Sequence, residues 1–427
     1  MQRSPRKTSL DPQQQRAFAI DVVKRLRERG FEALWAGGCV RDHLLGRVPK
    51  DYDVATNARP QAVQEAFDDR HTLAIGAAFG VIGVIGGRKQ GMVEVTTFRC
   101  DERYGGGHRP ESVSFGTAQE DAVRRDFTIN GLFFDPIDER VIDYVGGRED
   151  IERRVVRAIG DPRKRFEEDK LRMLRAVRMA TTLSFALDEP TADALRSMAG
   201  GINEISAERI AQELRLMLVL DQRRRALELL RETDLLHAIL PEVSMDDASW
   251  TRTLDVIGAL PGASFPLVLA CLLGETTSLG PRPLDQQWSA VRRRLRLSNE
   301  EHRHVAWLLI HRQELTSADI APWSRIQPIL AGAPAVELVD WHEARGGATP
   351  ALIFCREKLR LPREELDPPP LITGDDLMNH GVPAGELYSP LLREVRNAQL
   401  DGVLNSKNEA LEFVDRRLAE LRIVKEE

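Results

Sequence analysis

Three acidic residues near the N-terminus have the types and spacing of a metal site. Asp51 and Asp53 are one residue apart in KDYDVAT, and Glu94 lies in the apolar-flanked segment VEVTTF. Alternate side chains of a strand share a face, so the two aspartates are expected to point the same way and to repel each other unless a cation lies between them. We therefore expect Asp51 and Asp53 to bind Mg²⁺, with Glu94 as a third carboxylate from a neighbouring strand. A chance DxD and a surface glutamate paired with arginine are the alternatives.

A glycine turn precedes the acidic pair. In LWAGGCVRD an apolar strand leads into Gly37-Gly38, and Arg41 follows. Exposed backbone N–H groups of such a turn can bind phosphate. Two Mg²⁺ ions about 4 Å apart can activate an attacking hydroxyl and stabilise leaving pyrophosphate. The stretch from Leu34 to Thr56 therefore indicates metal-dependent chemistry on a phosphate.

The elements that must position these residues change character along the chain. Asp11-Pro12 predicts the start of a helix that ends at Gly30, and short strands and one further helix follow over the first third. After residue 150 helical periodicity takes over, and Asp161-Pro162 opens an expected helix carrying FEEDKLRMLRAVRMATTL. A Pro-rich linker begins at Asp367. The pattern predicts an α+β domain followed by helical domains.

Composition limits the class of protein. The chain has 427 residues, 42% of them hydrophobic and 30% charged, and lacks both a membrane-length apolar run and a secretion signal. Its four cysteines show no metal-site or disulfide spacing. Net charge of −6 argues against a protein that coats nucleic acid, whereas clustered arginines leave RNA as a partner. We expect a cytoplasmic protein without a membrane partner.

Five ordered motifs resemble the class II tRNA nucleotidyltransferase and poly(A) polymerase family, and the C-terminal LITGDDLMNHGVPAGELYSPLLREVRNAQLDG is similar to the tail of many bacterial CCA-adding members. The motifs are GGCVRD, KDYDVAT, VEVTTFR, RRDFTINGLFFDP and EEDKLRMLRAVRM. The resemblance implies an α+β nucleotidyltransferase head of polymerase beta-like fold, followed by an all-α neck, body and tail. The implied boundaries are residues 1–148, 149–205, 206–366 and 367–427.

The resemblance also implies roles for particular residues. Asp51, Asp53 and Glu94 match the catalytic carboxylates, with Asp51 and Asp53 as the metal ligands. Asp126 lies before a short TING strand. The positions that match nucleotide-contacting or primer-contacting residues are Gly38, Arg41, Arg125, Asp126, Glu168, Asp169, Arg172, Arg175 and Arg178.

Asp169 and Arg172 match a pair that acts as a protein template for the incoming base. Their spacing of three residues predicts that both project from one helix face. A carboxylate accepts from an exocyclic amine and a guanidinium donates to a ring nitrogen, which suits cytosine and adenine but not uracil or guanine. An ordinary surface ion pair is the alternative for this spacing.

The implied activity is addition or repair of the 3′-terminal CCA of tRNA from CTP and ATP with Mg²⁺. The implied partners are these nucleotides and the acceptor arm and 3′ end of tRNA, with no obligatory protein partner evident. The alternatives are a poly(A) polymerase, an A-adding enzyme that works with a separate CC-adding partner, and a non-catalytic RNA-binding relative. The glycine-rich loop from Arg99 to Ser112 is expected to be mobile, which suits a change of nucleotide from C to A, with a plain connection as the alternative. Family members that add only C tend to lack part of this loop, so its full length here favours an enzyme able to add A.

Overall fold

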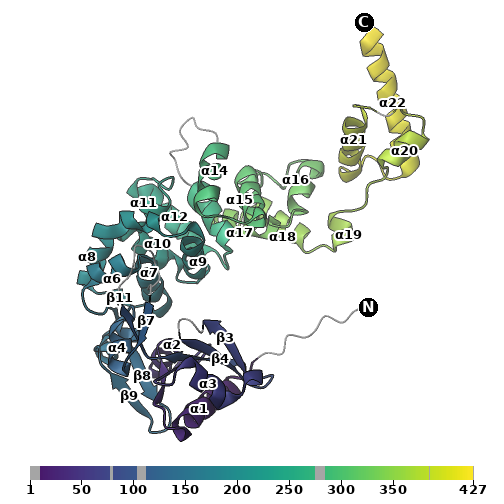
Figure 1. Cartoon of the computed structure of the whole chain (residues 1–427). Coiled ribbons are helices and arrows are strands. Elements are labelled where there is room, and N and C mark those ends of the chain that lie inside the picture. Colours follow the sequence, from purple (N-terminus) through teal and green to yellow (C-terminus); the bar gives the residue numbers. More distant parts are fainter. Residues whose placement is uncertain (1–9, 77–79, 103–111, 275–283, 384, 427) are drawn as a thin grey trace. The chain divides into compact units, whose positions relative to one another are not determined.

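The computed structural model describes residues 10–76, 80–102, 112–274, 284–383 and 385–426 (Figure 1). The chain divides into two compact units, the N-terminal unit Met1–Pro241 and the C-terminal unit Glu242–Glu427. The N-terminal unit begins with an α+β region and continues into helices, and the C-terminal unit is helical where it is described. The predicted fold class is confirmed. The finer boundaries at 148, 205 and 366 stay predictions.

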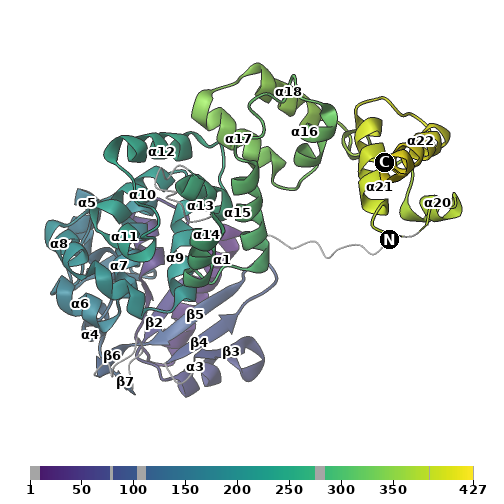
Figure 2. The ribbon, with the colours of Figure 1, turned by 90° about the horizontal axis from the view of Figure 1, so that it is seen from above.

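A seven-stranded mixed sheet organises the α+β region, with strand order β3-β4-β5-β2-β1-β8-β9. Strands β2 and β5 are parallel neighbours, and Figure 2 shows them beside β4 and β3. The strands are β1 (Ala33–Ala36), β2 (Asp53–Thr56), β3 (Thr72–Gly76), β4 (Val81–Ile85), β5 (Met92–Thr97), β8 (Leu132–Asp135) and β9 (Arg140–Asp143).

Helices cover the two faces of this sheet unequally. Helices α1 (Pro12–Glu28) and α3 (Pro60–Phe67) pack on one face, against β1, β2, β4 and β5. The opposite face is covered over β1 and β8, where α4 (Ala118–Val123) packs Ala118 and Ala122 against Leu34 and Phe133. Along β5, exposed and buried residues alternate, so every second side chain faces away from α1 and α3.

Further elements of the N-terminal unit connect the sheet to the helical region. Arg99–Glu102 (β6) pairs with Ser112–Phe115 (β7), and the two-residue strands β10 (Val155–Val156) and β11 (Ala186–Leu187) pair with each other. The 3₁₀ helices are η1 (Asp69–His71), η3 (Thr128–Asn130) and η4 (Ala199–Glu204). The remaining helices are α2 (Gly38–Leu44), α5 (Gly147–Arg153), α6 (Pro162–Glu168), α7 (Leu171–Leu183), α8 (Glu189–Met198), α9 (Ala207–Leu218), α10 (Arg223–Glu232) and α11 (Leu235–Ile239).

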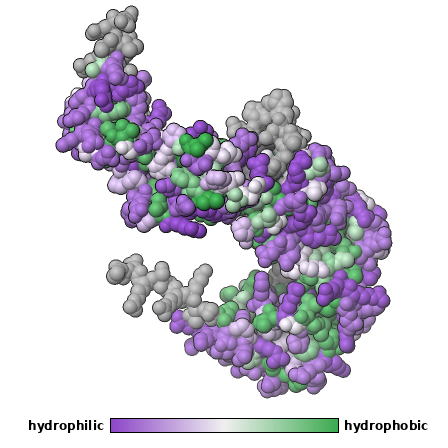
Figure 3. Space-filling model, turned by 180° about the vertical axis from the view of Figure 1, so that it is seen from behind, coloured by the Kyte–Doolittle hydropathy of each residue, from purple (hydrophilic) through white to green (hydrophobic). Residues whose placement is uncertain are grey.

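The C-terminal unit ends in a helical module with its own apolar core, which includes Leu377, Leu391 and Val414. No described helix of the protein combines the length and the apolar character needed to cross a membrane. Hydrophilic residues dominate the surface seen in Figure 3, and hydrophobic residues form separate patches on it. The helices of this unit are α12 (Asp247–Ala259), α13 (Phe265–Gly274), α14 (Leu284–Arg294), α15 (Asn299–His311), α16 (Trp323–Leu330), α17 (Ala335–Gly346), α18 (Pro350–Leu359), α19 (Arg363–Leu366), α20 (Gly374–Asn379), α21 (Tyr388–Leu400) and α22 (Lys407–Glu426).

Local predictions succeeded where short-range chemistry controls the backbone. The predicted start of α1 is confirmed, because the Asp11 carboxylate accepts hydrogen bonds from the backbone N–H groups of Gln13 and Gln14.

The predicted TING strand is wrong. Thr128–Asn130 form the 3₁₀ helix η3, and the strand begins only at Leu132.

Candidate active site

A cavity of about 690 Å³ in the N-terminal unit collects all the predicted site residues except Glu168. Its lining combines carboxylates on and beside the sheet with arginines from α2, α7 and α9, from β6 and from the end of α4. The predicted residues that line it are Gly38, Arg41, Asp51, Asp53, Glu94, Arg125, Asp126, Asp169, Arg172, Arg175 and Arg178. Residues far apart in the sequence thus meet at one place.

The acidic centre depends on the parallel pairing of β2 with β5. Asp53 is the first residue of β2 and lies directly opposite Glu94 in β5. Asp51 lies in the bend before β2, so the expectation that both aspartates belong to one regular strand is wrong. All three carboxylates nevertheless line the cavity.

The electrostatics of this centre favour a bound cation. Burial raises the pKa of Asp53. The negative charges of Asp51 and Glu94 raise it further and the positive charge of Arg125 lowers it, so that the pKa of Asp53 reaches about 6. In the described part of the chain, no group of three or more His, Cys, Asp or Glu side chains is already arranged to hold a metal ion. Mg²⁺ commonly takes only one or two carboxylates from a protein and the rest of its ligands from phosphates and water. The oxygen donors of Asp51 and Asp53 fit that pattern.

The glycine turn lies at the start of α2 and beside the arginines. Gly37 has a φ of 72°, a conformation that side chains disfavour. A Cβ atom at Gly37 would lie 2.7 Å from Nη1 of Arg125. The position therefore admits the guanidinium of Arg125 only because residue 37 is glycine.

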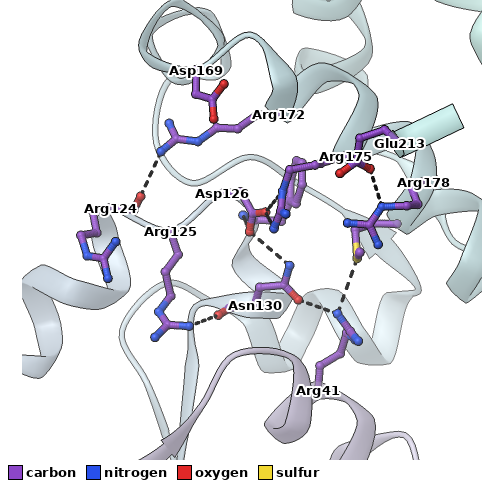
Figure 4. A network of polar contacts seen from close by, with 12 residues as sticks. Arg41, Arg124, Arg125, Asp126, Asn130, Asp169, Arg172, Arg175, Arg178 and Glu213 are labelled. Atoms are coloured by element: carbon purple, nitrogen blue, oxygen red, sulfur yellow. Dashed lines mark hydrogen bonds and ion pairs between the residues drawn. The ribbon is translucent and has the colours of Figure 1, made fainter. Parts of the chain in front are cut away.

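One chain of polar contacts links the arginines of α7 to α2 (Figure 4). Arg175 donates to Oδ2 of Asp126 over 2.6 and 2.9 Å, and the side-chain amide of Asn130 donates to Oδ1 of Asp126 over 3.1 Å. Nη1 of Arg41 in turn donates to Oδ1 of Asn130 over 2.7 Å. Asn130 was not predicted as a site residue. Its position in TING, four residues after Asp126, was the available signal.

Other arginines at the cavity are held by buried carboxylates. Asp121, 1% exposed, accepts from Arg124 over 2.5 Å and from Arg125 over 2.9 Å. Arg178 pairs with Glu213 of α9 over 2.5 Å. Such pairing holds the guanidinium groups in place at the cavity, and guanidinium groups held in this way could bind phosphate there.

The expected continuous helix through residues 161–183 is wrong. Helix α6 ends at Glu168, Asp169 is extended with φ of −148° and ψ of 103°, and α7 begins at Leu171. Oδ1 of Asp169 accepts from the backbone N–H of Leu171 over 3.0 Å, a local bond that competes with helix formation. Asp169 and Arg172 therefore do not share one helix face, and the break between α6 and α7 brings both to the cavity instead.

Each member of this pair has its own supporting contacts. Oδ2 of Asp169 accepts from Arg209 over 3.1 Å. Nη1 of Arg172 donates to Glu168 over 2.5 Å and to the carbonyl oxygen of Arg165 over 3.0 Å. Glu168 thus does not line the cavity but holds Arg172, and Arg209, which does line it, was not predicted. The glycine-rich part of the Arg99–Ser112 loop lies outside the described residues.

The buried Asp126–Arg175 pair makes a testable contribution to stability. Burial acts to raise the pKa of Asp126, but Arg175, Asn130 and the backbone N–H of Phe127 outweigh it and lower the pKa to about 2. The stabilisation is therefore complete above the unfolded pKa of about 4 and is lost as pH falls towards 2. We expect Arg175→Met to lower the free energy of unfolding by about 3 kcal/mol at pH 7, because it leaves a buried carboxylate unpaired.

Thermal unfolding of the full chain between pH 3 and pH 7 measures this loss. Arg196→Met is the matched control, because Arg196 pairs with Asp193 at an exposed site and should contribute less than about 1 kcal/mol. Equal melting temperatures for Arg175→Met and Arg196→Met at pH 7 would contradict the assignment.

Comparisons with known proteins agree with this fold and cavity. Residues 33–157 match the "Poly A polymerase head domain", and residues 184–246 match the "Probable RNA and SrmB- binding site of polymerase A". These matches define a nucleotidyltransferase with a poly(A) polymerase type of head.

Relatives extend the match to most of the chain. A CCA-adding enzyme from Lactobacillus johnsonii is 30% identical over 93% of this chain and 96% of its own length. A CCA-adding enzyme from Geobacillus stearothermophilus is 42% identical over 52% of this chain and 54% of its own length. Poly(A) polymerase I from Haemophilus influenzae is 36% identical over 53% of this chain and 52% of its own length. The chain therefore spans about half the length of several of the curated relatives that it matches, including the last two.

Solved structures share the fold. The CCA-adding enzyme of Bacillus stearothermophilus in complex with CTP has a TM-score of 0.77 and 29% identity, covering 96% of this chain and 99% of that one. The Thermotoga maritima CCA-adding enzyme with tRNA has a TM-score of 0.67 and covers 94% of this chain and 95% of that one. At 20% identity, this similarity shows a shared fold. The chain belongs to the class II tRNA nucleotidyltransferase family, which includes CCA-adding enzymes and bacterial poly(A) polymerases. Members of this family generally use a divalent metal.

Proposed function

We propose that the protein adds or repairs the 3′-terminal CCA of tRNA from CTP and ATP. The observation that supports the proposal is that the carboxylates of Asp51, Asp53 and Glu94, several arginines and the Asp169/Arg172 pair line the same cavity. Metal, triphosphate and base each find a partner there, and no nucleic-acid template is required. The reaction would take place in the cytoplasm.

The carboxylates and arginines divide the chemistry between them. Asp51 and Asp53 would hold Mg²⁺, with Glu94 beside them. The bound ion would activate the attacking hydroxyl and neutralise charge on the leaving pyrophosphate. The 3′-hydroxyl of the RNA would lose its proton to solvent water as its oxygen bonds to the α-phosphorus. The bond from that phosphorus to the oxygen that bridges it to the β-phosphorus would break, and pyrophosphate would leave. Arginines already held by Asp121, Asp126 and Glu213 would orient the triphosphate without reorganising.

The Asp169/Arg172 pair would choose the base. Asp169 would accept from N4 of cytosine or N6 of adenine, and Arg172 would donate to the neighbouring ring nitrogen. Uracil and guanine present a carbonyl beside an N–H, so both protein groups would lose their partners. The cost of leaving buried polar groups unpaired supports strong rejection.

The similarity pattern favours CCA addition over poly(A) synthesis. The relative matched over 96% of its length is a CCA-adding enzyme, whereas the poly(A) polymerase I matches cover 50–52% of those proteins. We propose that the helical neck, body and tail (residues 149–205, 206–366 and 367–427) hold the tRNA acceptor arm by shape and backbone contacts. The main alternatives remain poly(A) synthesis and addition of A alone.

A nucleotide-addition assay tests the proposal. The purified protein receives a tRNA transcript that lacks CCA, with Mg²⁺ and either CTP, ATP or both. We expect two additions with CTP, none with ATP alone, and three with both nucleotides. Long A tracts would identify a poly(A) polymerase, and addition only to a tRNA that already ends in CC would identify an A-adding enzyme.

A further inference from the structure

Four apolar side chains of the described strands are partly exposed on the sheet face that carries the proposed catalytic carboxylates. We name Leu73, Ile75, Ile85 and Met92 the apolar strip; their exposure ranges from 39% to 53%. Met92 lies two residues before Glu94 on β5, and Ile85 pairs with Met92, so both face the same way as Glu94. Apolar side chains of this size gathered in one place are unusual on a surface that has no partner.

Gly83 joins the strip to the active site. It pairs with Glu94 on one side and with Leu73 on the other, and Glu94 pairs in turn with Asp53. A Cβ atom at Gly83 would lie 2.7 Å from Sδ of Met92 and 2.8 Å from Cδ1 of Ile75. The side chains of Met92 and Ile75 therefore cover Gly83, and strand pairing leads from Glu94 through Gly83 to Leu73 on β3, the edge strand of the sheet.

The strip lies on the side of the carboxylates away from the arginines. The cavity's arginines come from α2, α7 and α9, from β6 and from the end of α4, and none of those that line it comes from β3 or β4. An in-line displacement needs the attacking oxygen and the leaving pyrophosphate on opposite sides of the phosphorus. With triphosphate on the arginines, the attacking strand has to approach over β4 and β3.

Charge at the far end of the strip suits an RNA strand. The turn between β4 and β5 carries exposed Arg88 and Lys89, five to six residues before Glu94. Only Met92 and Val93 separate Glu94 from this turn along β5, so the turn lies at the end of the strand that carries Glu94. Cations there can meet phosphates, and the apolar strip can pack against unpaired bases without reading their identity.

We propose that the apolar strip binds the last nucleotides of the RNA primer and delivers its 3′-hydroxyl to the Asp53–Glu94 pair. This inference rests on the proposed function and adds to it a primer subsite. The strip binds the growing end of the RNA, while the arginine side binds the incoming nucleotide.

The test compares primer and nucleotide affinity in one variant. We expect Ile75→Asn/Ile85→Asn to raise KM for tRNA lacking CCA by about tenfold, while KM for CTP and kcat change less than twofold. Ile137→Asn is the matched control. Ile137 is 40% exposed in the same unit, but it lies between β8 and β9, at the edge of the sheet opposite β3. A melting temperature close to that of the parent protein verifies folding of both variants.

Photo-crosslinking supplies a second readout. A tRNA that carries 4-thiouridine at its 3′ end should crosslink to peptides from β3, β4 or β5. If the parent protein adds nothing to tRNA, the proposed function fails. If it adds CCA, but the tRNA KM of the variant is unchanged and crosslinks map elsewhere, the primer subsite is wrong. Loss of self-association in the double variant with unchanged KM would show that the strip binds a second copy, which also overturns the proposal.

Discussion

Replacing Asp53 by Asn is expected to slow nucleotide addition by about a thousandfold or more and, without metal, to stabilise the fold. The rate falls because metal assistance contributes several kcal/mol to the transition state and each 1.4 kcal/mol is a factor of ten. The stability rises because Asp53 lies against Asp51 and Glu94 and its pKa is raised to about 6. Removing the charge relieves this repulsion.

The pH dependence of the stability gain follows from the same pKa. A carboxylate whose folded pKa exceeds its unfolded pKa destabilises the fold above about pH 6, and protonation relieves this as pH falls towards 4. The advantage of Asp53→Asn in EDTA should therefore be roughly 2 kcal/mol at pH 7.5 and nearly absent at pH 4. Thermal unfolding in EDTA, compared with unfolding in Mg²⁺, measures it.

Asp135→Asn is the matched control, with the opposite sign. Burial acts to raise the pKa of Asp135, but Arg27, 2.7 Å away, and backbone N–H groups outweigh it and lower the pKa. This variant should lose stability and keep the addition rate of the folded protein. An Asp53→Asn protein that adds nucleotides at the parent rate would show that the metal assignment is wrong.

Replacing Arg172 or Asp169 by Ala is expected to reduce base selectivity by about a hundredfold or more, with a smaller effect on triphosphate binding. A site that hydrogen-bonds the correct base can reject an incorrect one by roughly 10⁴-fold. Each alanine removes one of the two groups that distinguish cytosine and adenine from uracil and guanine. Ratios of kcat/KM for CTP over UTP and for ATP over GTP measure the loss.

Lys170→Ala is the control for this pair. Lys170 lies between Asp169 and Leu171 but pairs with Glu204 over 2.8 Å, and it does not line the cavity. Its replacement should leave both ratios unchanged. Unchanged ratios in the Arg172 and Asp169 variants as well would exclude a role for this pair in base choice.

Residue types and local spacing predicted the acidic pair and the glycine turn, and the resemblance to a known family predicted the other site residues. The Asp11-Pro12 start of α1, the alternation along β5 and the membership of Asp53, Glu94 and Arg125 in one site were all predicted from the sequence. Capping and strand alternation depend on neighbours a few residues away, so they can be recognised locally. The site residues were predicted through ordered motifs, which identified the family but not the contacts.

Long-range packing settled the rest. The alignment of Asp53 with Glu94 requires β2 and β5 to pair in parallel across forty residues, and no local pattern specifies that register. The contact of Asn130 with Arg41 exists only once η3 and α2 meet, and the contact of Asp126 with Arg175 exists only once α7 packs beside them. At Asp169 helical periodicity predicted one helix, yet the carboxylate bonds the backbone of Leu171 and pairs with Arg209 of α9. Helical periodicity favoured continuity there, but the local bond to Leu171 competes with the helix, and the contact with Arg209 holds the carboxylate at the cavity wall.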